Sequence, residues 1–579
     1  MAGFALLAIV KLQAALPTTS LTKPYFHWEG RGGGLYSMST LFVRLLTFAA
    51  LAKCSTTALK QRAAQPLPNL IMLLVDDLGF NAPGYVNPLL LTPAIDALAA
   101  EGIKLPNSYT YRFCSPTRGA FLTGRLPWKL PQTRSNFAPA SIMDGTPLGY
   151  RMLPARLADA GYVSYHVGKW HLGMYCPQYT PLGRGFNYSD GFLSGGEDHF
   201  SLAAHTGLGK TCPKPGSMEI RDAYINSAPA PDKVGEWTGG RFAEVAVRDI
   251  ANHTARHGDS PLFMYYAFHD THEPIEVPEE YSDLYLNTPA NITLPLQRTF
   301  YGMVSSIDSA VANLTAALKA AGLYENTLIV WMTDNGSPPS VAGSNYPLRG
   351  GKSANFEGGV RVPAFVSGGL VPASQRGTTA RGLIHIVDWY ATFATLAGLN
   401  PAADPAPGLP AVDGVNLWDW LVGSANASPR TGIVLDHSIY DPCPQCPSPH
   451  QGAGLGIHGA LISGRWKLLV GPKGGSYLAS WYGLFSPNAS GNIGDATACG
   501  NDSPCGGCLF DLQADPTEHV DLCATESQVF QQLLAEFVAL NSTYHPPNDQ
   551  PPSDLNASCS AAVENDRMFV PWRTEPVIL

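Results

Sequence analysis

The stretch FYGMVSSIDSAVANLTAALKAAGLYENTLIVWMTDN, from Phe300 to Asn335, indicates the fold of this chain. Its first part repeats apolar residues every three or four positions, the spacing that places side chains on one face of a helix. The residues on that face are Phe300, Val304, Ile307, Val311, Leu314 and Leu318. The second part contains a continuously apolar run, TLIVWM, which predicts a buried strand over Thr327 to Met332. A helix that leads into a buried strand is typical of an α/β protein.

The same alternation extends outward from this stretch. Further strands are predicted at LIMLLV (Leu70 to Val75), YVSYHV (Tyr162 to Val167) and PLFMYYAF (Pro261 to Phe268). Helices are predicted over Thr92 to Glu101, Arg151 to Ala160 and Arg241 to Arg256. Because the strands are apolar throughout, both of their faces should be covered. We therefore expect the α/β class, with a large, mostly parallel sheet and helices on both of its faces.

The character of the chain changes after about residue 400. A proline-rich connector, NPAADPAPGLP, is followed by short strand-like stretches such as GIVLDHS and ALISGRWKLLVG. Insertions rich in Gly, Cys and Asn lie between Gly474 and Cys508. We expect three parts: a leader region at 1–65, a large α/β domain at 66–424, and a smaller C-terminal α+β domain at 425–579 with an antiparallel sheet and Cys-rich insertions.

Composition limits the possible partners. The 579 residues carry a net charge of −9 without a block of like charge, which disfavours nucleic acid. An anionic substrate would need a local basic pocket, because the overall field would repel it. No apolar stretch long enough for a membrane span follows the N-terminal region, so we expect no stable membrane anchor.

The leader and the glycosylation sites point to export. Apolar runs after Met1 and after Met38 are both candidate signal peptides, and the alternative is a disordered extension. Asn-x-Ser/Thr sites occur at Asn187, Asn252, Asn291, Asn313, Asn335, Asn426, Asn488, Asn501, Asn541 and Asn556. The expected location is secreted, extracellular or periplasmic, with a lysosomal or vacuolar destination as the alternative. In such a compartment the pairs Cys443/Cys446 and Cys505/Cys508 are expected to form disulfides, and zinc ligation is the alternative.

Two pairs of polar residues follow predicted strands. Asp76 and Asp77 come directly after LIMLLV, and Asp334 and Asn335 follow TLIVWM with one residue between. Ligand sites of parallel sheets form beyond the carboxyl ends of the strands, so the two pairs can converge. Three carboxylates and an amide oxygen suit Ca²⁺ or Mg²⁺. The alternative is that these residues cap helices or form turns.

A second candidate feature is CSPTRGAFLTGR, Cys114 to Arg125. Ser115 is a favoured N-cap and Pro116 suits the first helical position, so a helix should begin just after Cys114. The helix N-terminus and Arg118 would attract an anion to that cysteine. The alternative is a buried small side chain or half of a disulfide.

Basic groups follow other strands. GKWHLG supplies Lys169 and His171, THEP supplies His272, and PLRGGKSANFEGGVRVP supplies Lys352 with Arg349 nearby. The first two segments follow strands and the third follows the TDNG loop. The same edge of the sheet can therefore gather these cations around an anionic group.

These stretches together resemble the type I sulfatases, a family within the alkaline phosphatase superfamily. DDLG, CSPTRGAFLTGR, GKWHLG, THEP, TDNG and LRGGK-x4-EGGVRVP stand in family order from residue 76 to residue 363. CLFDLQADPTEHVDL, Cys508 to Leu522, is similar to the C-terminal segment of the family. The spacing and the HEPIEVPEEY segment look closest to the arylsulfatase B-like branch, which acts on sulfated sugars.

The resemblance implies a function and a set of roles. Cys114 would be converted to formylglycine by a formylglycine-generating enzyme during secretion, and its hydrate would attack the sulfur of a small-molecule or carbohydrate sulfate ester. One Ca²⁺ per chain would be held by Asp76, Asp77, Cys114, Asp334 and Asn335. The implied catalytic residues are Cys114, Arg118, Lys169, His171, His272 and Lys352.

Each of these residues has an implied task. Arg118 would orient the hydrate, while Lys169, Lys352 and His272 would neutralise the sulfate oxygens. His272 or Lys352 would protonate the leaving alcohol. Asp334 would take the proton of the attacking hydroxyl, and His171 that of the second hydroxyl.

Two other functions fit parts of the pattern. A phosphomonoester or phosphodiester hydrolase of the same superfamily could use a metal at these strand ends, but only one metal site is visible and the nucleophile position is a cysteine. An inactive glycan-binding secreted glycoprotein would be expected to lack some site residues, and none is missing. We therefore expect an arylsulfatase-type sulfuric ester hydrolase.

Overall fold

The protein is described by a computed structural model over residues 66–130, 142–204, 219–286, 292–338, 341–403, 408–439, 457–470, 505–545 and 552–577. The expected leader, the Cys443/Cys446 segment and residues 471–504 of the later insertion lie outside these ranges. The chain from Pro66 onward forms one compact unit. The division at residues 424 and 425 stays a prediction.

A ten-stranded mixed sheet forms the centre of this unit, in the order β12-β2-β11-β9-β1-β8-β4-β5-β6-β7. Its middle strands β9, β1, β8, β4 and β5 are mutually parallel, while β11 and β6 pair antiparallel with their neighbours. The bounds are β1 (Asn69–Val75), β2 (Ile103–Lys104), β4 (Val163–Lys169), β5 (Tyr188–Phe192), β6 (Tyr224–Ile225), β7 (Ala228–Pro229), β8 (Leu262–Ala267), β9 (Thr327–Thr333), β11 (Ala364–Ser367) and β12 (Thr378–Thr379).

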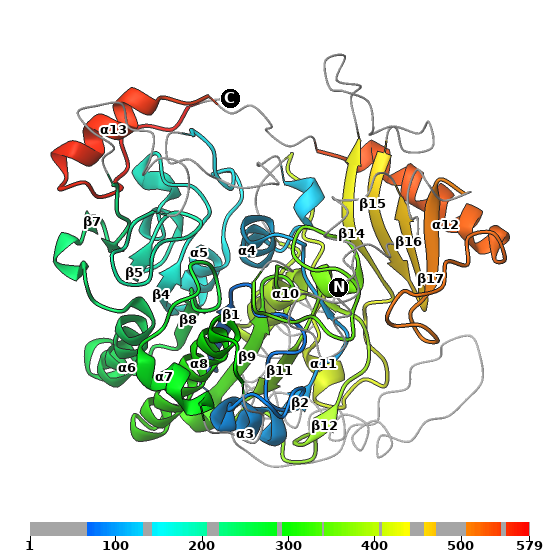
Figure 1. Ribbon diagram of the computed structural model, residues 1–579, viewed down its shortest axis with the longest axis horizontal. Helices are drawn as coiled ribbons and strands as arrows, with labels where there is room; N and C mark the ends of the chain where they lie inside the picture. The colour runs from blue at the N-terminus through cyan, green and yellow to red at the C-terminus, as the bar shows by residue number, and fades with distance from the viewer. Residues whose placement is uncertain are drawn as a thin grey trace, which may run out of the picture. The chain divides into compact units, whose positions relative to one another are not determined.

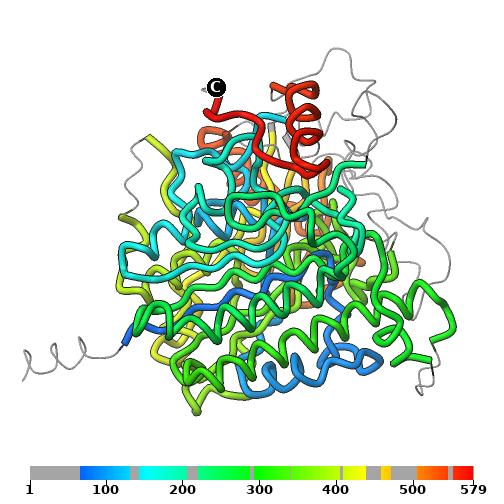
Figure 2. Tube along the Cα trace, turned by 90° about the vertical axis from the view of Figure 1, so that its left-hand side faces the viewer, coloured from blue at the N-terminus to red at the C-terminus, as the bar shows by residue number. Residues whose placement is uncertain are grey.

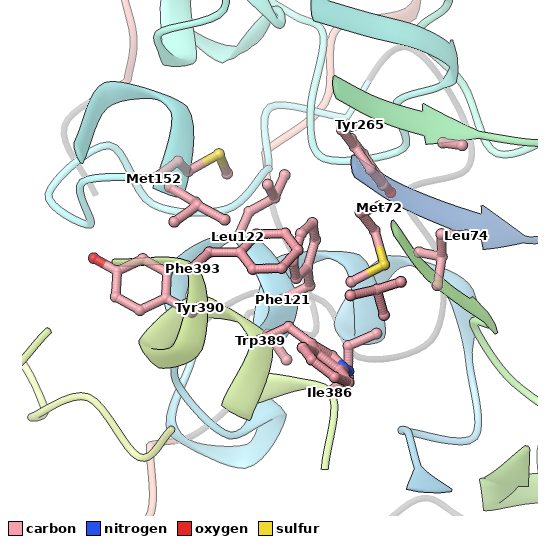
Figure 3. Close-up of a cluster of buried hydrophobic side chains, with 14 of the residues drawn as sticks. Met72, Leu74, Phe121, Leu122, Met152, Tyr265, Ile386, Trp389, Tyr390 and Phe393 are labelled. Atoms are coloured by element: carbon pink, nitrogen blue, oxygen red, sulfur yellow. The ribbon is translucent and has the colours of Figure 1, made fainter. Parts of the chain in front are cut away.

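The apolar residues of β1 are divided between two cores. Successive side chains of a strand point to opposite faces of the sheet. Met72 and Leu74 therefore pack with Phe121 and Phe393 on one face, as Figure 3 shows. Ile71 and Leu73 belong to the core of the other face, with residues of the long helices. This arrangement confirms a sheet covered on both faces.

Helices lie on both sides of the sheet. Their bounds are α3 (Pro93–Glu101), α4 (Cys114–Thr123), α5 (Leu153–Leu157), α6 (Thr238–His257), α7 (Glu279–Ser282), α8 (Pro295–Ala320), α9 (Glu357–Val360), α10 (Val387–Leu396), α11 (Trp418–Leu421), α12 (Ser527–Ala539) and α13 (Leu555–Glu564). Helix α3, in blue, lies beside the green helix α8 in both views (Figure 1 and Figure 2), and Ile95 N donates to Asp308 at 2.8 Å between them.

Two predicted elements take a different form in the structure. The helix expected over Arg151 to Ala160 is a short α5 followed by a 3-10 turn at Ala158–Ala160. The stretch ALISGRWKLLVG is a hairpin rather than one strand, because the chain reverses at Gly464, whose φ is +58°. Glycine adopts this left-handed conformation without steric cost.

The C-terminal strands form a separate antiparallel sheet in the order β14-β15-β16-β17 (Figure 1). Its strands are β14 (Gly432–Ile439), β15 (Ile457–Ser463), β16 (Trp466–Val470) and β17 (Gly507–Asp511). A further three-stranded sheet contains β3 (Ser108–Tyr109), β10 (Arg361–Val362) and β13 (Ile384–His385). The expected large mostly parallel sheet and smaller antiparallel sheet are both confirmed.

A buried ionic cluster joins the C-terminal sheet to the rest of the unit. Lys467 of β16 has its Nζ 2.8 Å from carboxylate oxygens of both Glu357 and Glu518. Glu518 also accepts from the backbone N of Glu357 at 2.7 Å, and Tyr109 donates to Glu357 at 2.9 Å. All three charged side chains are buried, and a buried charge needs such partners. The cluster explains why the segment CLFDLQADPTEHVDL carries a glutamate at position 518.

Among the cysteines that the structure describes, four are paired and two are free. Cys505 forms a disulfide with Cys523, and Cys508 and Cys559 are also disulfide-bonded. Disulfides at Cys505 and Cys508 contradict zinc ligation by that pair. Cys114 and Cys176 are buried free thiols. Within the described ranges, no helix combines the length and apolar character needed to cross a bilayer.

Candidate active site

Two neighbouring strands bring the acidic residues together. β1 and β9 are parallel and in register, with Val75 opposite Thr333. The backbone N of Asp334 donates to Val75 O at 2.9 Å, and that of Asp77 donates to the Asp334 carboxylate at 3.3 Å. The predicted convergence of the two pairs at one edge of the sheet is thus observed, and Asp76, Asp77, Asp334 and Asn335 are all buried.

Helix α4 carries Cys114 to the same place. Its thiol donates to Asp76 Oδ1 at 3.4 Å and lies 4.0 Å from Asp77 Oδ1. The helix begins at Cys114, two residues earlier than predicted, because Phe113 rather than Ser115 is the last extended residue. Pro116, which lacks an N–H, still falls within the first turn, where no intrahelical partner is needed.

Arg118 connects this helix to β9. Its guanidinium donates to one oxygen of Asp334 from Nε at 3.1 Å and from Nη2 at 2.8 Å, and Nη2 lies 3.6 Å from Asp76. Nη1 contacts Tyr265 OH at 3.2 Å. Arg118 is fully buried. It therefore sits beneath Cys114 as a fixed positive charge.

The three predicted basic residues reach the same carboxylates. Lys169, at the end of β4, donates to Asp76 at 2.5 Å. Lys352 donates to Asp77 at 2.6 Å, and Nε2 of His272 lies 3.8 Å from the same Asp77 oxygen. Lys169 is fully buried, while Lys352 and His272 each keep 16% of the side chain exposed. The latter two therefore form the accessible side of the site.

His171 lies two residues beyond Lys169, and its ring packs on Gly195. A Cβ at position 195 would stand 2.6 Å from His171 Nε2, so a larger residue there would displace the ring. Burial, together with the charges of Lys169 and Arg118, lowers the pKa of His171 well below its usual value. The ring is therefore neutral and available as a proton acceptor.

Several residues of the site hold left-handed backbone conformations. Asp77, His171, Thr271 and Ser353 have φ between +55° and +77°. Such conformations are uncommon in residues other than glycine and often mark functional sites. Each of these four residues is a proposed site residue or adjoins one, while five other non-glycine residues with positive φ lie elsewhere in the described chain.

The electrostatics of the carboxylates reflect this crowding. Burial raises the pKa of Asp76, but Lys169 and the other cations outweigh it and hold this pKa well below its usual range. Burial and the charge of Asp76 raise the pKa of Asp334 to about 7. Burial also raises the pKa of Asp77, and that of the Cys114 thiol.

The donor set fits a hard divalent cation. Oxygen atoms of Asp76, Asp77 and Asp334 and the sulfur of Cys114 lie within 4.8 Å of one another. Asn335 donates from Nδ2 to Asp77 at 2.5 Å, while its Oδ1 is buried and has no hydrogen-bond partner in the described part of the chain. A buried acceptor of this kind calls for a ligand. That oxygen could coordinate a cation bound by the carboxylates.

Two site residues were missed by the sequence reasoning. Tyr265 lies inside β8 and contacts Arg118 through its hydroxyl. Thr271 precedes His272 and donates from Oγ1 to the backbone O of Asp76. Tyr265 gives no local signal, because an aromatic residue in a buried strand usually only packs. Thr271 is adjacent to the THEP histidine and could have been suspected from that position alone.

Comparison with known proteins assigns the family. The Sulfatase family model matches residues 68–399. The chain belongs to the sulfatase family. This sulfatase is 32% identical over 519 residues to arylsulfatase J of Mus musculus, across 88% of this chain and 81% of the relative. It is 36% identical over 392 residues to N-acetylgalactosamine-6-sulfatase of Homo sapiens, across 65% of this chain and 68% of the relative.

A solved structure agrees with the fold of this sulfatase. Ps i-CgsB, determined in complex with k-i-k-neocarrahexaose, superposes with a TM-score of 0.65 at 25% identity, covering 87% of this chain and 99% of that one. The family expected from the sequence motifs is therefore confirmed. The closer resemblance to the arylsulfatase B-like branch stays a prediction.

Proposed function

We propose that this sulfatase hydrolyses sulfate esters of sugars with a formylglycine made from Cys114. The observation that carries the proposal is the position of Cys114, 3.4 Å from Asp76 and beside the carboxylates that Lys169, Lys352, His272 and Arg118 contact. Formylglycine would supply a hydrated aldehyde as the nucleophile. In this proposal the chain is exported and meets the formylglycine-generating enzyme during export. It is then secreted or delivered to lysosomes.

We assign the divalent cation as Ca²⁺, held by Asp76, Asp77, Asp334, Asn335 and the side chain at position 114. Carboxylate and amide oxygens are preferred by hard cations, and calcium tolerates irregular oxygen sites better than magnesium does. When bound, the cation would supply positive charge to the sulfate group. The unpartnered Asn335 oxygen supports this assignment.

The remaining roles follow from position. Lys352 and His272, on the accessible side, would face the sulfate oxygens and the leaving oxygen, so either could donate the proton to the departing alcohol. Asp334, fixed by Arg118, would accept the proton of the attacking hydroxyl. Neutral His171 would accept the proton of the second hydroxyl. Lys169 would hold the buried side of the sulfate.

The proposed substrates are sugars, for two reasons. A relative 36% identical to this chain is named N-acetylgalactosamine-6-sulfatase, and Ps i-CgsB was crystallised with an oligosaccharide.

The surface also carries candidate glycosylation sites in positions open to modification: Asn187, Asn313, Asn426, Asn541 and Asn556 are exposed. Asn335 is buried and should stay unglycosylated.

The test compares two chromogenic substrates with the same leaving group. The protein, secreted from cells that contain the formylglycine-generating enzyme, should turn over an aryl sulfate much faster than the matching aryl phosphate. Protein from cells without that enzyme should carry an unmodified Cys114 and be inactive. Faster turnover of the phosphate would instead support a phosphoester hydrolase, and no turnover of any aryl or sugar sulfate by the modified protein would refute the proposal.

A further inference from the structure

Another buried carboxylate belongs to the C-terminal sheet and contacts the segment that precedes Cys114. Asp436 of β14 is fully buried. It accepts from Tyr111 OH at 3.2 Å and from Asn355 Nδ2 at 3.1 Å. Arg112 Nη2 lies 3.2 Å and His458 Nε2 lies 4.0 Å from its Oδ2. One carboxylate thus organises side chains from three separate segments of the chain.

Two of these side chains come from segments that also carry active-site residues. Arg112 is two residues before Cys114, and Asn355 is three residues after Lys352. The two segments are held together by a hydrogen bond from Ser353 N to Arg112 O at 2.9 Å. The cluster is therefore tied by short stretches of backbone to the nucleophile position and to an accessible cation of the site.

Within this cluster Asp436 is buried, whereas the side chains of Arg112 and His458 are partly exposed. The side chains of Arg112 and His458 keep 19% and 17% of their surface exposed, against 0% for Asp436. The Arg112 guanidinium also lies over the ring of Phe113, 5.9 Å from the ring centre. Asn355 Oδ1 is a buried acceptor without a hydrogen-bond partner among the described residues. Such an acceptor favours a ligand that donates hydrogen bonds.

The chemistry of these groups suits a sugar rather than an aryl group. A guanidinium and an imidazole can donate to hydroxyl, carboxylate or sulfate oxygens, and the Asn355 amide oxygen can accept from a sugar hydroxyl. An aryl leaving group offers none of these partners. The ion pair with Asp436 restricts the Arg112 side chain, which reduces the entropy lost when a ligand binds.

We propose that Arg112, Asn355 and His458 bind the sugar that carries the scissile sulfate, and that Asp436 is the positioning residue that holds them. This proposal rests on the proposed sulfatase function and names its substrate class. It also gives the C-terminal sheet a task in catalysis, since β14 and β15 supply two members of the cluster. Residues on both sides of the junction between the large sheet and the C-terminal sheet then determine which leaving group the enzyme accepts.

The experiment measures the ratio of two specificity constants. Wild type is first tested with an aryl sulfate and a panel of monosulfated saccharides, and the best saccharide is kept. Arg112→Gln, Asn355→Ala and His458→Gln should each lower kcat/KM for that saccharide about tenfold more than kcat/KM for the aryl sulfate, the effect of one hydrogen bond to a charged or polar group. The desulfated saccharide should also inhibit aryl sulfate turnover more weakly in these variants.

Arg465→Gln is the matched control. Arg465 also pairs with an aspartate of the same sheet, Asp511, but follows the far end of β15 from His458. The Arg465→Gln variant should leave the ratio of the two specificity constants unchanged. An equal fall for both substrates in the Arg112, Asn355 and His458 variants would show a structural role and overturn the proposal, as would no fall for either.

The outcomes separate this inference from the proposed function. Wild-type turnover of the aryl sulfate with no saccharide accepted would overturn the sugar assignment and leave the sulfatase function standing. Absence of turnover of any sulfate ester would refute the proposed function itself. Should Arg112→Gln fail to fold, the Asn355→Ala and His458→Gln variants and the inhibition by desulfated saccharide still decide the question.

Discussion

Arg118 donates two hydrogen bonds to a single oxygen of Asp334, from Nε at 3.1 Å and from Nη2 at 2.8 Å. This contact joins the helix that carries Cys114 to the loop after β9, and both side chains are fully buried. Lysine would preserve the charge but could not form both bonds at once. The pair therefore fixes the distance between the nucleophile position and the carboxylates.

Arg118→Lys should lower turnover by on the order of 10²-fold, because a small displacement of reacting groups costs this much. Arg125→Lys is the control, since Arg125 on the same segment donates to the carbonyl oxygens of Pro410 and Thr123. It should reduce thermal stability while turnover per folded molecule is kept. Normal kcat in Arg118→Lys, measured on folded protein, would contradict the positioning role.

Chelation should remove activity. Because the proposed ligands are oxygen atoms, a calcium-selective chelator should lower turnover, Ca²⁺ should restore it, and Zn²⁺ should not. Metal bound per chain, measured by elemental analysis, should fall in Asn335→Ala, which removes the unpartnered oxygen. Full activity after exhaustive chelation, with no metal found, would refute the assigned ligand set.

Lys352 and His272 can be distinguished by the leaving group. Each alanine variant should lose on the order of 10²-fold in turnover, as is usual for electrostatic and acid–base groups. The residue that protonates the leaving alcohol should lose less with an acidic phenol, which departs without a proton. The other residue should lose equally with all aryl sulfates. Near-normal turnover in both variants would show that neither contacts the reacting group.

Much of the site could be predicted because its residues follow continuously apolar strands. Asp76 and Asp334 come directly after buried runs, and parallel strands must bring their carboxyl ends to the same edge. The positions of the four strands predicted from apolar runs were accurate for the same reason. Helix ends were less accurate: α4 begins at Cys114, since backbone conformation at Phe113 and not the Ser115 side chain decides its start.

The contacts around Asp436 could not be predicted from the sequence. Tyr111 and Asp436 are 325 residues apart, and no periodic pattern links a loop residue to a strand of another sheet. The buried cluster of Glu357, Lys467 and Glu518 is similar, because its members come from three segments that meet only after folding. The C-terminal segment that contains Glu518 was recognised in the sequence, but the ion pair that Glu518 forms could not be predicted from it.

The stability of this junction should depend on pH. Burial, with the neighbouring charge of Glu357, raises the pKa of Glu518 from 4.5 to about 7, although Lys467 opposes the shift. The folded state then binds more protons than the unfolded chain between these values. Stability from this group is therefore present at low pH and lost as pH rises from about 4.5 to about 7, by up to about 3 kcal/mol.

Glu518→Gln cannot ionise, so its thermal midpoint should improve relative to wild type as pH rises through that window. Asp159→Asn is the contrasting variant. The hydrogen bond with Arg151 lowers the pKa of Asp159. The stability that ionised Asp159 contributes is therefore lost as pH falls, not as it rises. Parallel pH profiles for wild type and Glu518→Gln would contradict a proton held at Glu518.

The last prediction concerns Cys114→Ser and separates the formylglycine proposal from a simple nucleophile. A hydrated aldehyde offers two hydroxyls on one carbon: one attacks sulfur, and the other lets the aldehyde re-form as sulfate departs. Serine offers only one. Because cysteine and serine are close in size and position 114 is buried in a helix, the variant should fold and be secreted. It should nevertheless fail to complete turnover and retain sulfate as a stable ester at residue 114, detected as added mass on that peptide. The wild-type peptide should react with a hydrazide, as an aldehyde does. Repeated turnover by Cys114→Ser, or a plain thiol at Cys114 in fully active wild-type protein, would rule out the aldehyde mechanism.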